Sequence, residues 1–253
     1  MKLGFGIRGA AGYRPGRERG MGMRRLLAAA LVVLSCGDAA HASDIKVTGV
    51  SVNGVNAALL MPPKPHGAVV LLAGSDGHIG VGADGSIARG GNQLVRTRNA
   101  YAARGLAVLV PEGDVNGAAA VEMMAHYGPV TLIATSRGTQ RAARGIAAGA
   151  RPARLVLTSG FLSDASGDRE NVANILGSPA ALPPTLVIEH RQDGCKRTLP
   201  AGVEPFLAWA KGKARVVWLD GGQSEGNPCE AMAYHGFNGI DGDVVAAAAA
   251  FAR

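Results

Sequence analysis

Hydrophobic residues along the chain gather into short, almost wholly apolar runs separated by longer segments of mixed character. Four such runs, each followed within a few residues by proline, glycine or serine, lie at 68–72, 106–110, 130–134 and 155–158. Continuous runs of this length are typical of parallel strands that are buried on both faces of a sheet. Two further strands are predicted at 184–189 and 215–219.

The segment before these runs has a different period. Apolar and polar residues alternate at 46–51 and 55–61, on either side of Asn53-Gly54. An Asn-Gly pair favours the tight turn that joins two antiparallel strands, so this pattern predicts a β-hairpin.

Helices are predicted between the apolar runs and after the last of them, at 92–104, 117–126, 138–148, 204–213 and 243–251. Strands that alternate with helices indicate right-handed βαβ units. We therefore predict an α/β fold: a three-layer sandwich with a mostly parallel central sheet flanked by helices. Segment 160–183 is rich in Ser, Asp, Gly and Asn. We interpret it as a surface loop, with a short cap or rim near a ligand site as the alternative.

Length and composition fit one globular domain over 43–253, since the chain has 253 residues, 47% hydrophobic and 18% charged. The net charge is +7, but residues 1–42 hold seven Lys or Arg and only two acidic residues. The remaining 19 basic and 17 acidic residues leave +2. The basic character therefore belongs largely to the N-terminal extension, and we expect no nucleic-acid partner.

Residues 1–42 have the pattern of an N-terminal extension followed by a secretory signal peptide. Arg24-Arg25 precedes the apolar stretch 26–34, which is too short to span a bilayer, and Ala40-His41-Ala42 fits a cleavage site. We expect cleavage after Ala42, a periplasmic or secreted protein, and no stable membrane span afterwards. An anchoring N-terminus and a lipoprotein cut before Cys36 are the alternatives.

Two cysteines, Cys195 and Cys229, remain after that cut. An even pair in an exported protein predicts a disulfide, here closing a 35-residue loop, with two unrelated buried thiols as the alternative. No cysteine or histidine ladder accompanies the pair, so it does not indicate a zinc site.

The run at 130–134 leads into Ala134-Thr-Ser136-Arg-Gly138. A strand that ends in small-X-Ser-X-Gly is typical of a sharp strand-to-helix turn, in which the residues two positions either side of a strained serine must be small. Ser136 is therefore a candidate nucleophile. A serine hydroxyl needs a base that takes its proton and a carboxylate that orients the base.

Asp193 is the candidate acid, because it follows the predicted strand at 184–189 by a few residues. The carboxyl ends of parallel strands form the edge at which α/β folds bind ligands. Asp193-Gly194 is also a common solvated turn pair. Asp164 and Asp168, after the preceding strand, are the reserve candidates.

His235 is the candidate base, since it lies after the last predicted strand and before the last helix. His190 competes because it is three residues from Asp193. It falls at a strand end, however, and it precedes the acid, whereas the order along the chain known for triads on this kind of fold is serine, acid, base. The other histidines of the mature chain, His66, His78 and His126, precede the serine, and His126 remains a pocket candidate.

Two backbone N–H groups are needed near the nucleophile to bind a developing oxyanion. We expect one from Arg137 and the other from the glycine-rich loop after 68–72, with Ser75 as first choice and Asp76 as second. That loop lacks a Gly-Lys-Ser/Thr ending and a G-x-G-x-x-G pattern, so it does not indicate phosphate binding.

These motifs together resemble the α/β-hydrolase superfamily of serine hydrolases, of the exported dienelactone-hydrolase or esterase type found in bacteria. The resemblance rests on the loop 74–77, the elbow 134–138, the segment 190–193 and Tyr234-His235-Gly236-Phe237, and it covers about residues 68–240. It implies an eight-stranded sheet or a trimmed version of it, and a triad of Ser136, Asp193 and His235. Ala134 replaces the first elbow glycine, which is a minor departure because alanine is also small.

The resemblance also sets the functional expectation: a serine hydrolase that cleaves a carboxylic ester or related acyl bond of a small molecule through an acyl-enzyme. No metal or organic cofactor is expected, and the chain would act as a monomer or homodimer. A catalytically silent binding protein of the same fold and an acyltransferase with the same triad are the alternatives.

Overall fold

One sheet of eight strands organises residues 44–253, the part of the chain that this computed structural model describes. The strands are β1 (Lys46–Val52), β2 (Val55–Met61), β3 (Ala68–Leu72), β4 (Ala107–Pro111), β5 (Val130–Thr135), β6 (Arg154–Thr158), β7 (Thr185–His190) and β8 (Ala214–Leu219). Their order in the sheet is β1-β2-β4-β3-β5-β6-β7-β8. β2 pairs antiparallel with both β1 and β4, and the other neighbours pair in parallel, as predicted.

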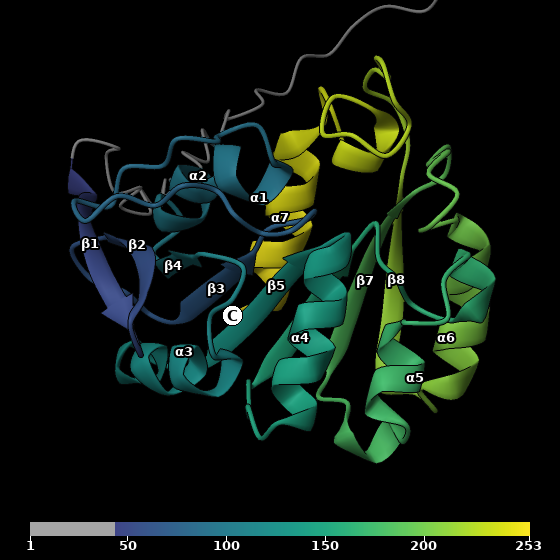
Figure 1. The fold of residues 1–253 in the computed structure, drawn as a ribbon, viewed down its shortest axis with the longest axis horizontal. Coiled ribbons are helices and arrows are strands. Elements are labelled where there is room, and N and C mark those ends of the chain that lie inside the picture. Colours follow the sequence, from purple (N-terminus) through teal and green to yellow (C-terminus); the bar gives the residue numbers. More distant parts are fainter. Residues whose placement is uncertain (1–43) are drawn as a thin grey trace, which may run out of the picture. The chain divides into compact units, whose positions relative to one another are not determined.

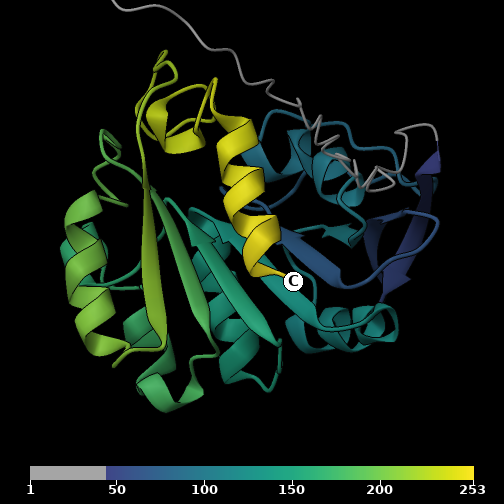
Figure 2. The same cartoon turned by 180° about the vertical axis from the view of Figure 1, so that it is seen from behind.

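Helices cover both faces of this sheet (Figures 1 and 2). They are α1 (Gln93–Arg96), α2 (Arg98–Ala102), α3 (Gly117–Met124), α4 (Arg137–Ala147), α5 (Val172–Leu176), α6 (Val203–Trp209) and α7 (Asp241–Phe251). Helices α3 to α6 pack on one face, and α1, α2 and α7 pack on the other. The predicted three-layer sandwich is confirmed.

Side-chain alternation along the strands divides the core between these two layers. In β3, Val70 and Leu72 belong to the apolar cluster under α3 to α6, whereas Val69 and Leu71 belong to the cluster under α1, α2 and α7. All four are buried, which explains why β3 has no polar position. Burial of each such side chain stabilises the fold by about 1.5–3 kcal/mol.

The hairpin at the edge of the sheet forms at the predicted turn. Val52 of β1 pairs with Val55 of β2 across Asn53 and Gly54, which have φ angles of 49° and 86°. Two successive positive φ angles match the right-handed twist of the flanking strands, and asparagine and glycine tolerate them best.

Two predicted segments differ in the structure. The helix expected over 92–104 is divided into α1 and α2 at Thr97, whose hydroxyl bonds back to the carbonyl of Gln93 at 2.7 Å and competes with regular helix continuation. Segment 160–183 is not a plain surface loop, because it contains α5 and buries Phe161, Leu162 and Val172.

The predicted signal peptide lies in residues 1–42, outside the described part of the chain. Within 44–253, no helix combines the length and the apolar character that crossing a membrane would require.

A disulfide joins Cys195 and Cys229, so the predicted pairing is confirmed. It connects the loop after β7 to the long segment between β8 and α7, which are 34 positions apart in sequence. The chain-entropy model gives about 3–4 kcal/mol of stabilisation for closing a loop of this length.

We expect reduction of this disulfide to lower the melting temperature by about 6–15 °C, because the unfolded chain regains the entropy of the open loop. Thermal unfolding followed by circular dichroism, with and without reductant, measures the shift. The double variant C195S/C229S is the control, since it should melt at the lower temperature and ignore reductant. Equal melting temperatures for the oxidised and reduced protein would contradict the expectation.

Candidate active site

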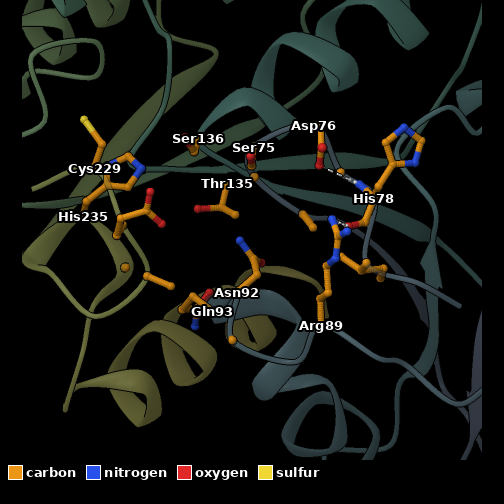
Figure 3. A pocket seen from close by; sticks show the side chains of 18 residues that line it. Ser75, Asp76, His78, Arg89, Asn92, Gln93, Thr135, Ser136, Cys229 and His235 are labelled. Atoms are coloured by element: carbon orange, nitrogen blue, oxygen red, sulfur yellow. Dashed lines mark hydrogen bonds between the residues drawn. The ribbon is translucent and has the colours of Figure 1, made fainter. Parts of the chain in front are cut away.

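The carboxyl ends of β3 and β5, the segment that leads into α1 and the segment after β8 border a cavity of about 340 Å³. Its wall includes the predicted residues Ser75, Asp76, Ser136, Cys229 and His235. Figure 3 shows the side chains around it, with His235 and Cys229 on one side and His78 and Arg89 on the other. The predicted residues that lie far apart in sequence therefore meet at one place.

Ser136 occupies the sharp turn between β5 and α4. Its φ of 51° and ψ of −127° form a backbone conformation that costs about 1–3 kcal/mol for a residue other than glycine. The turn is held from both sides: the Ser136 N–H donates to the Thr158 carbonyl at 3.0 Å, and the Ser136 carbonyl accepts from the Thr139 N–H at 2.9 Å. These bonds hold the serine in its strained conformation.

Gly138 explains why the turn needs a small residue two positions after the serine. A Cβ placed on Gly138 would lie 2.2 Å from the carbonyl oxygen of Leu72, at the end of β3. Any larger residue would push α4 away from β3, so the elbow pattern in the sequence has a direct steric cause.

Asp193 and His235 form a buried pair. Nδ1 of His235 lies 2.9 Å from Oδ2 of Asp193, and the two side chains are 5% and 0% exposed, respectively. The other carboxylate oxygen, Oδ1, accepts the Cys195 N–H at 2.8 Å. An Asp–His contact at Nδ1 leaves Nε2 as the free ring nitrogen, which is the arrangement a general base needs.

Thr198 contacts both members of this pair, and no sequence pattern predicted a role for Thr198. Its hydroxyl oxygen lies 3.1 Å from Nδ1 of His235, and it donates to Oδ2 of Asp193 at 3.4 Å. Thr198 is fully buried, so its hydroxyl shields the contact between the acid and the imidazole from water.

No hydrogen bond joins Ser136 Oγ to His235 among the described residues, although both side chains face the same cavity. Nucleophile–base hydrogen bonds are often long without substrate and tighten in the substrate complex. The structure thus brings Asp193 to His235, and it brings His235 to the cavity that Ser136 also lines.

The competing candidates have other contacts. His190 uses both ring nitrogens, because Nε2 lies 2.9 Å from the Gly221 carbonyl oxygen and Nδ1 accepts the Gln192 N–H at 3.1 Å. Its ring also stacks on Tyr234 with centroids 4.5 Å apart. His126 is exposed and lies outside the cavity wall. His190 is therefore a structural residue.

The reserve acids are also engaged away from His235. Asp164 accepts hydrogen bonds from the side chains of Asn171 and Asn174, and Asp168 forms an ion pair with Arg197 at 2.6 Å. Asp193 is therefore the one predicted acid that contacts the predicted base.

The candidate oxyanion loop, residues 73–76, follows β3 directly. Ser75 has a φ of 53°, and the turn is closed by a bond from the Gly77 N–H to the Gly74 carbonyl at 3.1 Å. Arg137 is the first residue of α4, where N–H groups lack partners within the helix. The two expected sources of backbone donors thus flank Ser136.

Several further residues line the cavity that sequence reasoning did not identify, among them His78, Arg89, Asn92, Gln93 and Glu230. Asn92 caps α1 through its side-chain oxygen, which accepts the Leu94 N–H at 3.1 Å, and Figure 3 shows its nitrogen directed into the cavity. The buried carboxamide of Gln93 has no hydrogen-bond partner among residues 44–253. His78 and Arg89 lie within the glycine-rich stretch 74–91 and Asn92 and Gln93 directly follow it, but no sequence motif marks these residues or Glu230.

Glu189 is a buried carboxyl next to this site. Burial raises its pKa well above the ordinary value, and the negative charge of Asp193 raises it further. Bonds from the backbone N–H groups of His190 and Gly160 act in the opposite direction. The raised pKa favours the protonated form, so Glu189 adds no second negative charge beside Asp193.

No cluster of His, Cys, Asp or Glu side chains suited to holding a metal ion occurs among residues 44–253. The cavity wall beside Ser136 instead combines the carboxamides of Asn92 and Gln93 with the ionisable side chains of Asp76, His78, Arg89, Glu230 and His235.

Comparisons with known proteins agree with this architecture. No family model and no curated protein matches the sequence. Among solved structures, the chain is similar to EstE5 soaked with p-nitrophenyl butyrate (16% identity, 83% of this chain and 85% of that chain, TM-score 0.51). It is also similar to a dienelactone hydrolase from Anabaena variabilis (16% identity, 81% of this chain and 95% of that chain, TM-score 0.56). A third similar structure is an esterase of the bacterial hormone-sensitive lipase family (19% identity, 83% of this chain and 84% of that chain, TM-score 0.51). Together with the strand order, these likenesses show that the chain has the α/β-hydrolase fold.

Proposed function

We propose that the chain is an exported serine hydrolase that cleaves carboxylic ester or related acyl bonds of small molecules. The observation that carries the proposal is the buried Asp193–His235 contact at 2.9 Å beside a cavity that also exposes a strained Ser136. This order of residues along the chain matches that of α/β-hydrolase triads.

In the proposed reaction, Ser136 Oγ attacks the substrate carbonyl carbon and Nε2 of His235 takes the hydroxyl proton. Asp193 stabilises the imidazolium, and N–H groups of Arg137 and of Ser75 or Asp76 stabilise the oxyanion. Collapse breaks the bond to the alcohol, which leaves with the proton from His235. Water then attacks the acyl-enzyme by the same route and releases the acid.

Export is part of the proposal. It is supported by the signal-like pattern of residues 1–42 and by the Cys195–Cys229 disulfide, because disulfides persist in oxidising compartments. The disulfide also ties the loop that carries Asp193 to the segment that carries His235, so in this account it supports both stability and the alignment of the pair.

Replacing Ser136 with alanine tests the nucleophile. We expect S136A to lower kcat on p-nitrophenyl butyrate by about 10⁴–10⁶-fold, because the attacking oxygen is lost, while the melting temperature changes little. Initial rates and thermal unfolding measure the two effects.

Ser178→Ala is the matched control, since Ser178 caps a short helix outside the cavity and should leave kcat unchanged. Turnover by S136A at the wild-type rate would refute the assignment. Analysis of the products formed in the presence of added alcohol distinguishes hydrolysis from acyl transfer. A folded wild-type protein without esterase activity would favour the alternative of a binding protein.

Replacing Glu189 with glutamine tests the electrostatics beside Asp193. In the unfolded chain this carboxyl ionises near its ordinary pKa of 4.5, whereas the folded state holds the proton to higher pH. The folded state therefore binds more protons in that interval, and wild-type stability falls as pH rises.

We thus expect the unfolding free energy of E189Q relative to that of wild type to increase by about 1–3 kcal/mol as the pH rises above 4.5. Urea unfolding at several pH values measures this difference, and Glu204→Gln at an exposed helix position is the control. A difference that does not vary with pH would contradict the raised pKa of Glu189.

A further inference from the structure

Arg141 lies in the second turn of α4, and its guanidinium reaches across to the candidate oxyanion loop. Nη1 donates to the Ser75 carbonyl at 3.0 Å, and Nη2 donates to the Ala73 carbonyl and lies 3.5 Å from the Gly74 carbonyl oxygen. One side chain therefore contacts three successive carbonyl groups of the loop.

The geometry of the peptide bond determines where the N–H groups of this loop point once the directions of its carbonyl groups are known. In a planar trans peptide, the carbonyl of one residue and the N–H of the next point in opposite directions. Because the carbonyls of Gly74 and Ser75 face Arg141, the N–H groups of Ser75 and Asp76 face away from it. These two N–H groups are the ones expected to bind the oxyanion.

The loop needs such a constraint. Ser75 has a positive φ of 53°, a conformation that is unfavourable for serine and persists only where surrounding contacts impose it. The rigid fork of a guanidinium can hold several acceptors at fixed positions, whereas a lysine ammonium presents a single point charge.

Other arginines near this loop have different partners. Arg144, three positions later on the same helix, pairs with Glu170, and Arg197 pairs with Asp168. Arg141 forms no ion pair with any described residue, and its hydrogen bonds go to the carbonyls of the loop. We call these contacts of Arg141 with the carbonyl groups of residues 73–75 the clamp.

We propose that Arg141 is a positioning residue that sets the oxyanion loop, so that the N–H groups of Ser75 and Asp76 point at the substrate carbonyl on Ser136. The catalytic part of this inference rests on the proposed function. The structural part, the orientation of the loop, does not depend on it.

Kinetics test the catalytic part. We expect R141M to lower kcat on p-nitrophenyl butyrate by about 10²-fold with KM changed less than about threefold, since a misplaced donor is felt mainly in the transition state. R141K keeps the charge without the fork and should fall between R141M and wild type. R144M is the matched control and should keep wild-type kcat, because it removes only an exposed ion pair.

Amide hydrogen exchange tests the structural part whether or not the protein is active. Peptides that cover residues 73–78 should exchange at least about tenfold faster in R141M than in wild type or R144M, because the loop loses its clamp. Peptides from β5 and β6 should be unchanged, which shows that R141M is folded.

The outcomes separate the two proposals. Loss of kcat together with faster exchange in R141M supports the positioning role. Unchanged exchange over 73–78, or a kcat of R141M equal to that of R144M in an active enzyme, overturns it. A wild-type protein without esterase activity, combined with faster exchange in R141M, contradicts the proposed function but upholds the clamp.

Discussion

The contact between the start of α4 and the end of β3 is the constraint on which the rest of the site depends. Gly138 approaches the Leu72 carbonyl so closely that a single Cβ would collide with it. The following turn of α4 brings Arg141 to the loop that continues from β3. One helix–strand contact therefore sets the strained Ser136 and the candidate oxyanion donors relative to each other.

The other half of the site depends on long-range contacts between the loop after β7 and the segment that joins β8 to α7. Asp193 and His235 are far apart in the sequence, and neither lies in a regular strand or α-helix. Their relative position is held by the Cys195 N–H, the Thr198 hydroxyl and the disulfide. Burial raises the pKa of Glu189 and so favours its neutral form, and Asp193 is the carboxylate that pairs with the imidazole in the proposed mechanism.

Local patterns predicted most of this arrangement. The apolar runs, the Asn53-Gly54 turn and the small residues around Ser136 each follow from a backbone or packing requirement that acts over a few residues. The order of Asp193 and His235 after Ser136 then predicted which side chains meet, because strand ends of a parallel sheet share one edge. The disulfide was predicted because two cysteines remain after the expected signal-peptide cleavage and because disulfides persist in the oxidising compartments to which exported proteins go.

Sequence reasoning missed features that depend on three-dimensional contacts. Arg141 resembles any other arginine of an Ala/Arg-rich helix, and its role appears only when the carbonyls of 73–75 are seen in front of it. Thr198 and Glu189 carry no motif, and their importance comes from burial beside Asp193. The break at Thr97 arises from a side-chain bond within the helix, and segment 160–183 is ordered by packing its apolar residues into the core.

The proposed function depends above all on Ser136 being an activated nucleophile. The most direct measurement is mass spectrometry of the protein after reaction with a fluorophosphonate, which forms a stable bond with activated serines. We expect one adduct per chain, located on the peptide that contains Ser136. An adduct on another serine, or none on folded protein, would contradict it.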